Sequence, residues 1–446
     1  MSRPRRGKKR PRPAPLRAPE VVTVTKVAQQ GDGEALLADG VRVFMPLTLP
    51  GDVVRVQPGA KRGDGMVASV LEFIETAPRV EPICPVFGQC GGCQLQHMPA
   101  DAYAAWKRDA VAAGLSRQGI DIELEPLRTV PLASRRRASL AAVMTQAGLR
   151  FGFNEAHSDR IIDISGCPLL VPALQNLLAP VRAMLVDILK GGERADIAMT
   201  AVGVSGQDVE LVITSGHKVD LKAREALAGF AEAQDVVRIA WSEPGLPPEQ
   251  IVQRRDLMLH LGGVDIQLPI NGFLQPSVDG EALLQDLVIE GLGDVVTAKG
   301  GRIADLYCGV GTFALPLAAA RKHVLAVDGI AAQAGALATA AGRAGLGGRL
   351  STDVRDLKME PLMPNELNEF DAVIFDPPRA GAKVQVEELA NSTVPCIIAV
   401  SCNPATLGRD LRILIDAGYR LDKVTPVDQF PMTHHAEAVA VLHRPS

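Results

Sequence analysis

The sequence predicts an α/β protein that ends in a doubly wound parallel sheet, preceded by a small β-barrel and a central region of mixed α+β structure. The last part carries the clearest signal, because apolar strands alternate with helical patterns from about residue 262. The strands end in loops that bear Gly, Asp or Cys, and they are expected at 302–306, 323–328, 371–376 and 396–401. This alternation is typical of a parallel sheet that binds ligands at the carboxyl ends of its strands. Near the N-terminus, short β-branched runs separated by Gly-Asp-Gly, Asp-Gly and Pro-Gly turns indicate the barrel instead.

A chain of 446 residues is too long for one hydrophobic core, and the patterns divide it into four parts. Residues 1–17 hold eight Lys or Arg and no acid, which predicts a disordered basic tail. The barrel follows at 18–76, and a central domain with a Cys-rich loop occupies 77–261. A helix expected at 101–120 either belongs to that domain or packs on the last one, which spans 262–446.

Composition narrows the class of protein. Hydrophobic residues make up 47% and charged residues 22%, as in ordinary globular domains. No apolar run approaches the ~20 residues of a membrane span, and the basic start lacks the apolar segment of a secretory signal. We therefore expect a cytoplasmic protein without a membrane or an evident protein partner. The net charge of −4 hides the basic tail, which is either a solubilising arm or a foothold on nucleic-acid phosphates.

The first chemical motif is a glycine loop in "RIADLYCGVGTFALPLA", where Gly309 and Gly311 let the backbone approach a ligand. The next strand ends in Asp328, which could accept hydrogen bonds from two ribose hydroxyls. These features fit a nicotinamide dinucleotide nearly as well as S-adenosylmethionine. In the later strand "FDAVIFDPPRAGA", Asp376 followed by two prolines forms a rigid turn at a strand end. An Asp-Pro-Pro turn in this position resembles an element of methyltransferases, and that resemblance favours S-adenosylmethionine.

The second motif is a cysteine at the end of the strand "PCIIAVSCNPATLGRDL". Cys402 leaves the strand into an Asn-Pro turn, which favours a reactive thiol at the open edge of the sheet, whereas Cys308 and Cys396 are expected to be buried hydrophobic residues. A thiolate that adds to C6 of uracil makes C5 nucleophilic enough to take a methyl group. A base must then remove the C5 proton, and "FPMTHHAEAVAVL" offers Glu437, with His434 and His435 beside it.

Three further cysteines are crowded into one Gly-rich loop as Cys84-x5-Cys90-x2-Cys93, and Cys167 in "DISGCPLL" is the candidate fourth ligand. Four thiolates suit either a zinc ion or an iron–sulfur cluster. Seven cysteines in a chain of this size do not indicate a disulfide framework.

The blocks "DLYCGVGTFALPLA", "DPPRAGA", "SCNPATLGRDL" and "FPMTHHAE" resemble the RNA 5-methyluridine methyltransferases in order and spacing, over nearly the whole chain. The resemblance implies a Rossmann-like methyltransferase domain, with Cys402 as nucleophile and Glu437 as general base. It also implies a set of S-adenosylmethionine contacts, which are Gln275, Tyr307, Thr312, Asp328, Asp356 and Asp376. Tyr307, Thr312 and Asp328 depart from the residues common in relatives, which are Phe, Asn and Glu. The loop before Asp356 varies in length.

Relatives with the same cysteine pattern carry a [4Fe–4S] cluster, so the resemblance favours iron over zinc for this loop. The barrel resembles a TRAM domain, an OB-like RNA-binding module. A chain with both features is similar to the branch that modifies 23S ribosomal RNA during rRNA processing. Arg135, Arg136 and Arg137 are expected to contact phosphates or to lie on a solvated strand face.

Three alternatives remain from the sequence. The first is a tRNA 5-methyluridine methyltransferase. The second is a 5-methylcytosine RNA enzyme, although the residues around Cys402 and Glu437 favour uracil. The third is a non-catalytic RNA-binding or folding factor that keeps the same fold.

Overall fold

The computed structural model describes residues 17–203, 206–293 and 300–445, and the predicted basic tail therefore lies almost wholly outside the described residues. The chain forms two compact units. One contains residues up to 81 together with 97–99, and the other contains 82–96 and everything from residue 100 onward. Among the described residues, every helix is too short or too polar to cross a bilayer.

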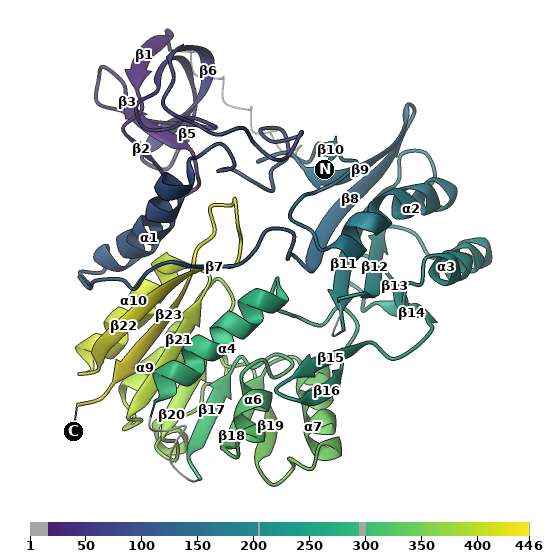
Figure 1. The fold of residues 1–446 in the computed structure, drawn as a ribbon, viewed down its shortest axis with the longest axis vertical. Helices are drawn as coiled ribbons and strands as arrows, with labels where there is room; N and C mark the ends of the chain where they lie inside the picture. The colour runs from purple at the N-terminus through teal and green to yellow at the C-terminus, as the bar shows by residue number, and fades with distance from the viewer. Residues whose placement is uncertain (1–16, 204–205, 294–299, 446) are drawn as a thin grey trace, which may run out of the picture. The chain divides into compact units, whose positions relative to one another are not determined.

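The first unit is a six-stranded antiparallel-rich sheet in the order β1-β5-β6-β4-β3-β2. The strands are β1 (Glu20–Thr23), β2 (Lys26–Val27), β3 (Gly33–Leu36), β4 (Arg42–Met45), β5 (Val53–Arg62) and β6 (Gly65–Glu75). β1 and β2 are two halves of one interrupted strand: Val24 N donates to Asp52 O just before β5, and Thr25 N donates to Glu34 O in β3. The first half of this strand pairs with β5 and the second half pairs with β3. Because it joins the two ends of the sheet in this way, the sheet closes into a small barrel (Figure 1).

The second unit begins with a central sheet in the order β10-β9-β8-β11-β12-β13-β14. Its strands are β8 (Arg137–Thr145), β9 (Gly148–Asn154), β10 (Ile161–Asp163), β11 (Arg194–Val202), β12 (Asp208–Ser215), β13 (Arg238–Ser242) and β14 (Glu249–Gln253). The helices α2 (Pro172–Ile188) and α3 (Leu221–Ala233) cover one face, where alternate strand residues such as Ile197, Met199 and Leu211 form the core.

A large sheet in the order β19-β18-β17-β20-β21-β23-β22-β7 follows. Its strands are β17 (Arg302–Leu306), β18 (His323–Asp328), β19 (Leu350–Val354), β20 (Ala372–Phe375), β21 (Cys396–Ser401), β22 (Arg420–Asp428), β23 (Glu437–His443) and the short β7 (Arg128–Thr129). The five strands from β19 to β21 are parallel, whereas β23 is antiparallel to both of its neighbours. The strands expected at 302–306, 323–328 and 396–401 form at those residues, and the one expected at 371–376 is one residue shorter at each end.

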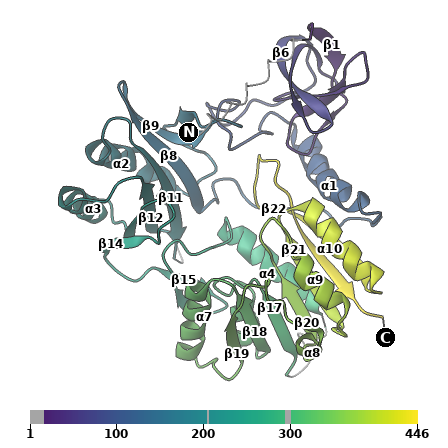
Figure 2. The same ribbon diagram turned by 180° about the vertical axis from the view of Figure 1, so that it is seen from behind.

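Both faces of this sheet are covered, because alternate strand residues point into two separate cores. One face packs against α4 (Val278–Leu292), α6 (Ala314–Ala319), α7 (Ala331–Arg343) and the hairpin of β15 (Met258–Leu261) and β16 (Val264–Gln267). The other packs against α1 (Ala100–Ser116), α8 (Pro364–Leu367), α9 (Lys383–Ala390) and α10 (Pro404–Asp416). Figure 1 shows α4 crossing the near face, and Figure 2 shows α9 and α10 on the opposite one.

Candidate active site

The glycine loop between β17 and α6 is a sharp turn of left-handed backbone. Tyr307 has φ of 61°, Gly309 of 55° and Gly311 of 93°. A Cβ on Gly311 would lie 2.6 Å from Cδ1 of Leu337 in α7, so only glycine fits there. The loop thus passes close over α7 in a conformation that requires glycine.

Asp328 at the end of β18 braces this loop. One carboxylate oxygen accepts from Gly309 N at 2.9 Å and the other from Ile330 N at 2.7 Å. The side chain is almost buried, and each oxygen keeps a further lone pair. The residue expected to contact a ribose therefore also shapes the glycine loop.

Three other residues expected to contact the cofactor lie in the glycine loop or near it. Thr312 is nearly buried and its carbonyl accepts from Gln285 in α4 at 2.9 Å. Tyr307 is half-buried, and burial raises the pKa of its phenol to about 12, helped by Asp410 and the exposed Asp356.

The carboxyl ends of β20 and β21 and the start of β23 bring Asp376, Cys402 and Glu437 to one edge of the sheet. Because β23 is antiparallel, its first residue lies where its parallel neighbours end, and Ala438 pairs with Ser401. Gln275, from the loop before α4, donates to Asp376 Oδ2 at 2.8 Å. The structure therefore gathers four of the residues that the sequence analysis selected.

A fifth residue, Gln429, completes this group and was missed by the sequence analysis. Its side-chain amide donates to Gln275 Oε1 at 3.1 Å and to Glu437 Oε2. A polar residue just after a strand gave no signal that would have distinguished it from an ordinary turn residue.

The site favours neutral forms of its acids. Burial raises the pKa of Asp376 to about 6, opposed by the Gln275 hydrogen bond. Burial also raises the pKa of Glu437 well above its usual range, and the charge of Asp376 adds to this. The pKa of Cys402 rises to about 11 through burial and through the Glu437 and Asp376 carboxyls, while Arg379 lowers it. Cys402 is therefore mainly a thiol at neutral pH.

The loop between β22 and β23 is held by a buried lysine on α1, which the sequence analysis also missed. Lys107 is fully buried, pairs with Asp428 at 2.7 Å and donates to the carbonyls of Phe430 and His435. Tyr103 donates to the other Asp428 oxygen at 2.5 Å. The helix expected near 101–120 thus lies on the face of the large sheet and secures the loop that leads to Glu437.

The two histidines of this loop occupy different settings. Burial lowers the pKa of His435 to about 3, with the positive charges of neighbouring groups adding to the effect, so its imidazole is neutral. His434 Nδ1 lies 3.1 Å from Oε1 of Gln94, which comes from the Cys-rich loop.

Two of the three arginines expected to contact phosphates bond to groups inside the protein, and the expectation is wrong for the buried Arg136. Arg136 is buried, pairs with Glu281 at 2.7 Å and donates to the carbonyl of Gln275 at 2.9 Å. Arg137 donates to Leu274 O at 3.1 Å. A sequence pattern cannot separate an internal arginine from an exposed one when its partners are far away along the chain.

The cysteines Cys84, Cys90, Cys93 and Cys167 are free and half-buried in the second unit. Burial, together with the charges of the other three thiols, raises the pKa of Cys93 to about 12, while a hydrogen bond with Gln96 opposes this. The four thiols therefore lie within electrostatic reach of one another, and their chemistry suits an iron–sulfur cluster. In the described residues, however, no three His, Cys, Asp or Glu side chains meet as a metal-holding group.

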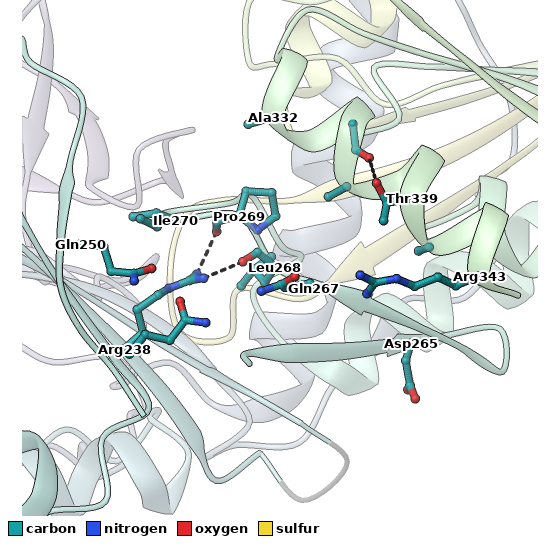
Figure 3. A pocket seen from close by; sticks show the side chains of 14 residues that line it. Arg238, Gln250, Asp265, Gln267, Leu268, Pro269, Ile270, Ala332, Thr339 and Arg343 are labelled. Carbon is teal, nitrogen blue, oxygen red and sulfur yellow. Dashed lines mark hydrogen bonds between the residues drawn. The ribbon is translucent and has the colours of Figure 1, made fainter. Parts of the chain in front are cut away.

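A pocket of about 340 Å³ lies elsewhere, between β13, β14, the β15–β16 hairpin and α7 (Figure 3). Its buried arginine, Arg238, pairs with Glu210 and donates to the carbonyls of Leu268 and Pro269. No residue expected at the site lines this pocket, so we attribute to Arg238 a structural role beneath the chain that leads to Gln275.

Comparisons with known proteins agree with this geometry. Residues 354–445 match the family model described as tRNA (uracil-5-)-methyltransferase. An uncharacterized RNA methyltransferase of Brucella suis is 40% identical over 422 residues, covering 94% of this chain and 97% of that protein. The 23S rRNA (uracil(1939)-C(5))-methyltransferase RlmD of Halomonas elongata is 32% identical, covering 95% and 89%.

Among solved structures, the Pyrococcus abyssi tRNA (uracil-54, C5)-methyltransferase in complex with S-adenosyl-L-homocysteine has a TM-score of 0.73. It is 24% identical, and the match covers 95% of this chain and 100% of that one. The likeness confirms the predicted fold class of a Rossmann-like domain with a small barrel and a mixed central region.

Proposed function

Because the chain belongs to the S-adenosylmethionine-dependent RNA (uracil-C5) methyltransferase family, we propose that it methylates C5 of a uridine in 23S ribosomal RNA through a covalent adduct of Cys402. The observation that supports this most is the meeting of a half-buried thiol with two carboxyls of raised pKa at one edge of the sheet. Such pairs of perturbed groups mark functional sites.

Cys402 is assigned the first step. The thiol first loses its proton to solvent. The thiolate Sγ then adds to C6 of uracil, and the C5–C6 electron pair moves to C5 and the neighbouring carbonyl as an enolate. Arg379 lowers the pKa of the thiol against three opposing influences, so we assign it to stabilising the thiolate. When bound, S-adenosylmethionine supplies the electrophilic methyl group that C5 then takes.

Glu437 is assigned the second half of the reaction. It removes the proton from the methylated C5, the C5–C6 double bond forms again, and the C6–S bond breaks to release Cys402. Because its pKa is raised, the Glu437 carboxylate binds the abstracted proton more tightly near neutral pH than an ordinary carboxylate does. Reaching C6 of a paired base also requires that the nucleotide leave its stack.

We assign cofactor binding to the side chains around the glycine loop and the Gln275 loop. The fit rests on the sharp left-handed turn of the glycine loop, which packs so closely on α7 that only glycine is accommodated at position 311. The assigned contacts are Gln275, Tyr307, Thr312, Asp328, Asp356 and Asp376.

Ribosomal RNA is the substrate we propose, because the Halomonas relative is named for 23S rRNA. The Pyrococcus structure is named for tRNA, which makes a tRNA uridine the second candidate. Mapping 5-methyluridine by mass spectrometry in both RNAs from a deletion strain distinguishes them. Loss from tRNA with unchanged rRNA would contradict the proposal. Loss from 23S rRNA would instead make the reaction part of rRNA processing, which we place in the cytoplasm.

The four cysteines of the second unit are proposed to hold a [4Fe–4S] cluster. The support is their mutual electrostatic coupling and the N–H of Gly92, which donates to Cys90 Sγ at 3.4 Å. Protein prepared without air should contain about four irons and four sulfides per chain, as that cluster requires. Stoichiometric zinc without sulfide would contradict it.

The barrel at 18–76 and the tail at 1–17 are proposed to bind RNA, the region at 77–261 to carry the cluster, and 262–446 to catalyse the reaction. The alternative is a non-catalytic RNA-binding or folding factor. In that case, substitution of Cys402 would leave the function of the protein in the cell unchanged.

The deciding experiment separates the two halves of the reaction. Cys402→Ala should form no adduct, whereas Glu437→Gln should attack, methylate once and stall as a methylated RNA–protein adduct that survives denaturing electrophoresis. Loss of a positioned base costs ~10²–10⁴-fold, enough for the adduct to accumulate. 5-Fluorouridine RNA should trap the wild type at the same point. An adduct with Cys402→Ala would overturn the assignment of the nucleophile.

A further inference from the structure

Gln429 lies between the cofactor side of the site and Glu437. It is buried, and its amide nitrogen joins Gln275 Oε1 to Glu437 Oε2. Because Gln275 also donates to Asp376, an unbroken chain of hydrogen bonds runs from Asp376 through two amides to Glu437.

Two neighbours fix Gln429 in place. The preceding residue, Asp428, is held by Lys107 and Tyr103. On the other side, Gly280 in the first turn of α4 leaves the space that the glutamine occupies. A Cβ on Gly280 would lie 2.7 Å from Gln429 Oε1 and 3.0 Å from its Cβ.

The side-chain carbonyl of Gln429 is left without a hydrogen bond, and this unfavourable state indicates a functional role for the residue. Within the described residues, Gln429 Oε1 is buried and has no hydrogen-bond partner, an unfavourable state for a polar atom. Both amide hydrogens are directed instead to Gln275 and Glu437. A residue selected for stability alone would satisfy its carbonyl as well, since buried polar groups are normally paired.

We propose that Gln429 is a positioning residue that holds Glu437 in place and favours its carboxylate form until it takes the C5 proton. The hydrogen bond engages Oε2 and leaves Oε1 to receive the proton. This inference rests on the proposed function, because it assumes that Glu437 is the base.

The direction of the effect follows from the groups that surround Glu437. Asp376 and Cys402 interact electrostatically with Glu437, Arg379 acts on Cys402 and on His435 in the preceding loop, and the ion pair of Glu281 with Arg136 lies beside Gln275. Asp376 opposes ionisation of Glu437, whereas the Gln429 N–H favours it. Loss of the amide should therefore raise the pKa of Glu437.

The test follows the decay of the methylated adduct in single-turnover reactions with an RNA fragment between pH 5.5 and 9. Gln429→Met should form the adduct normally but release it about 10- to 100-fold more slowly on the acid side. The acid limb should move up by about one to two pH units, which is the effect of losing one hydrogen bond to a charged group. A residue of purely structural importance would lower stability without moving this limb.

Two further variants separate the role of Gln429 from a general loss of stability. Gly280→Ala keeps the glutamine but displaces it, so it should shift the same limb upward. Gln385→Met removes another buried glutamine, which bonds to Leu362 N and O in a different core, and should leave adduct decay unchanged.

The outcomes separate the two proposals. If Glu437→Gln stalls while Gln429→Met and Gly280→Ala release with the wild-type pH profile, the role of Gln429 is overturned and that of Glu437 stands. If Glu437→Gln itself releases normally, the base lies elsewhere and both fall. An equal slowing in Gln385→Met would also overturn the role of Gln429.

Discussion

Replacing Asp376 with Asn should stabilise the protein at alkaline pH while impairing methylation. The pKa of Asp376 is about 6 in the folded protein against a value near 3.8 for an ordinary carboxyl. The folded state therefore binds the proton more tightly than the unfolded state does. Stability linked to this group is fully present below about pH 4 and is lost as the pH rises to about 6.

The size of the effect follows from that difference. About two pKa units correspond to about 3 kcal/mol at 1.36 kcal/mol per unit, and this is the upper limit for a half-buried group. Asn keeps an oxygen that can accept from Gln275 but carries no charge. The variant should therefore gain up to about 3 kcal/mol at pH 8 and nothing near pH 4.

Paired urea titrations of wild type and variant at pH 4.5, 6 and 8 measure this difference, with Asp187→Asn as an exposed control in α2. The difference in free energy of unfolding between variant and wild type should grow with pH for Asp376→Asn and stay constant for Asp187→Asn. A variant that is less stable at pH 8, or a gap that does not depend on pH, would refute the reasoning.

Three other changes test the supports of the site. Gly311→Ala places a Cβ 2.6 Å from Leu337 at a φ of 93°, so calorimetry should show weaker S-adenosylmethionine binding; unchanged affinity would contradict a close approach of this loop to the cofactor. Lys107→Met leaves Asp428 buried without its cation and should cost about 3–5 kcal/mol in urea unfolding, whereas a loss below 1 kcal/mol would mean that the loop rearranges. Deleting residues 1–75 should weaken RNA binding and flatten its salt dependence, measured by filter binding, while methylation of a short saturating RNA survives; loss of cofactor binding instead would assign this region to the catalytic part.

The large sheet was predictable from local patterns. Four of its five parallel strands are short apolar runs followed by a loop with Gly, Asp or Cys, and this pattern does not depend on distant residues. The fifth, β19, has the sequence Leu-Ser-Thr-Asp-Val and was not predicted. Once the strands are parallel, the ends of β20 and β21 must share one edge, which brings Asp376 and Cys402 together. Glu437 joins them because β23 runs in the opposite direction.

The supports of the site could not be predicted in the same way. Lys107 lies in a helix of ordinary composition, and its burial depends on Asp428, 321 residues later. Arg136 lies beside two other arginines in a pattern that is equally typical of an exposed strand. Gln429 meets Gln275 across 154 residues. In each case the side chain is explained by a partner that no local periodicity reveals.

The contact between Lys107 and Asp428 also bears on how the chain is made. During synthesis at about 5–20 residues per second, roughly 15 to 60 s pass between the appearance of the lysine and that of its partner. Until then α1 cannot bury this lysine against a carboxylate, and the face of the sheet that it covers stays incomplete. The loop that leads to Glu437 is anchored by the same lysine. A nascent chain that has already formed its barrel and glycine loop therefore still lacks the anchored loop before Glu437. The site is complete only when the last strands have been synthesised and pack against α1.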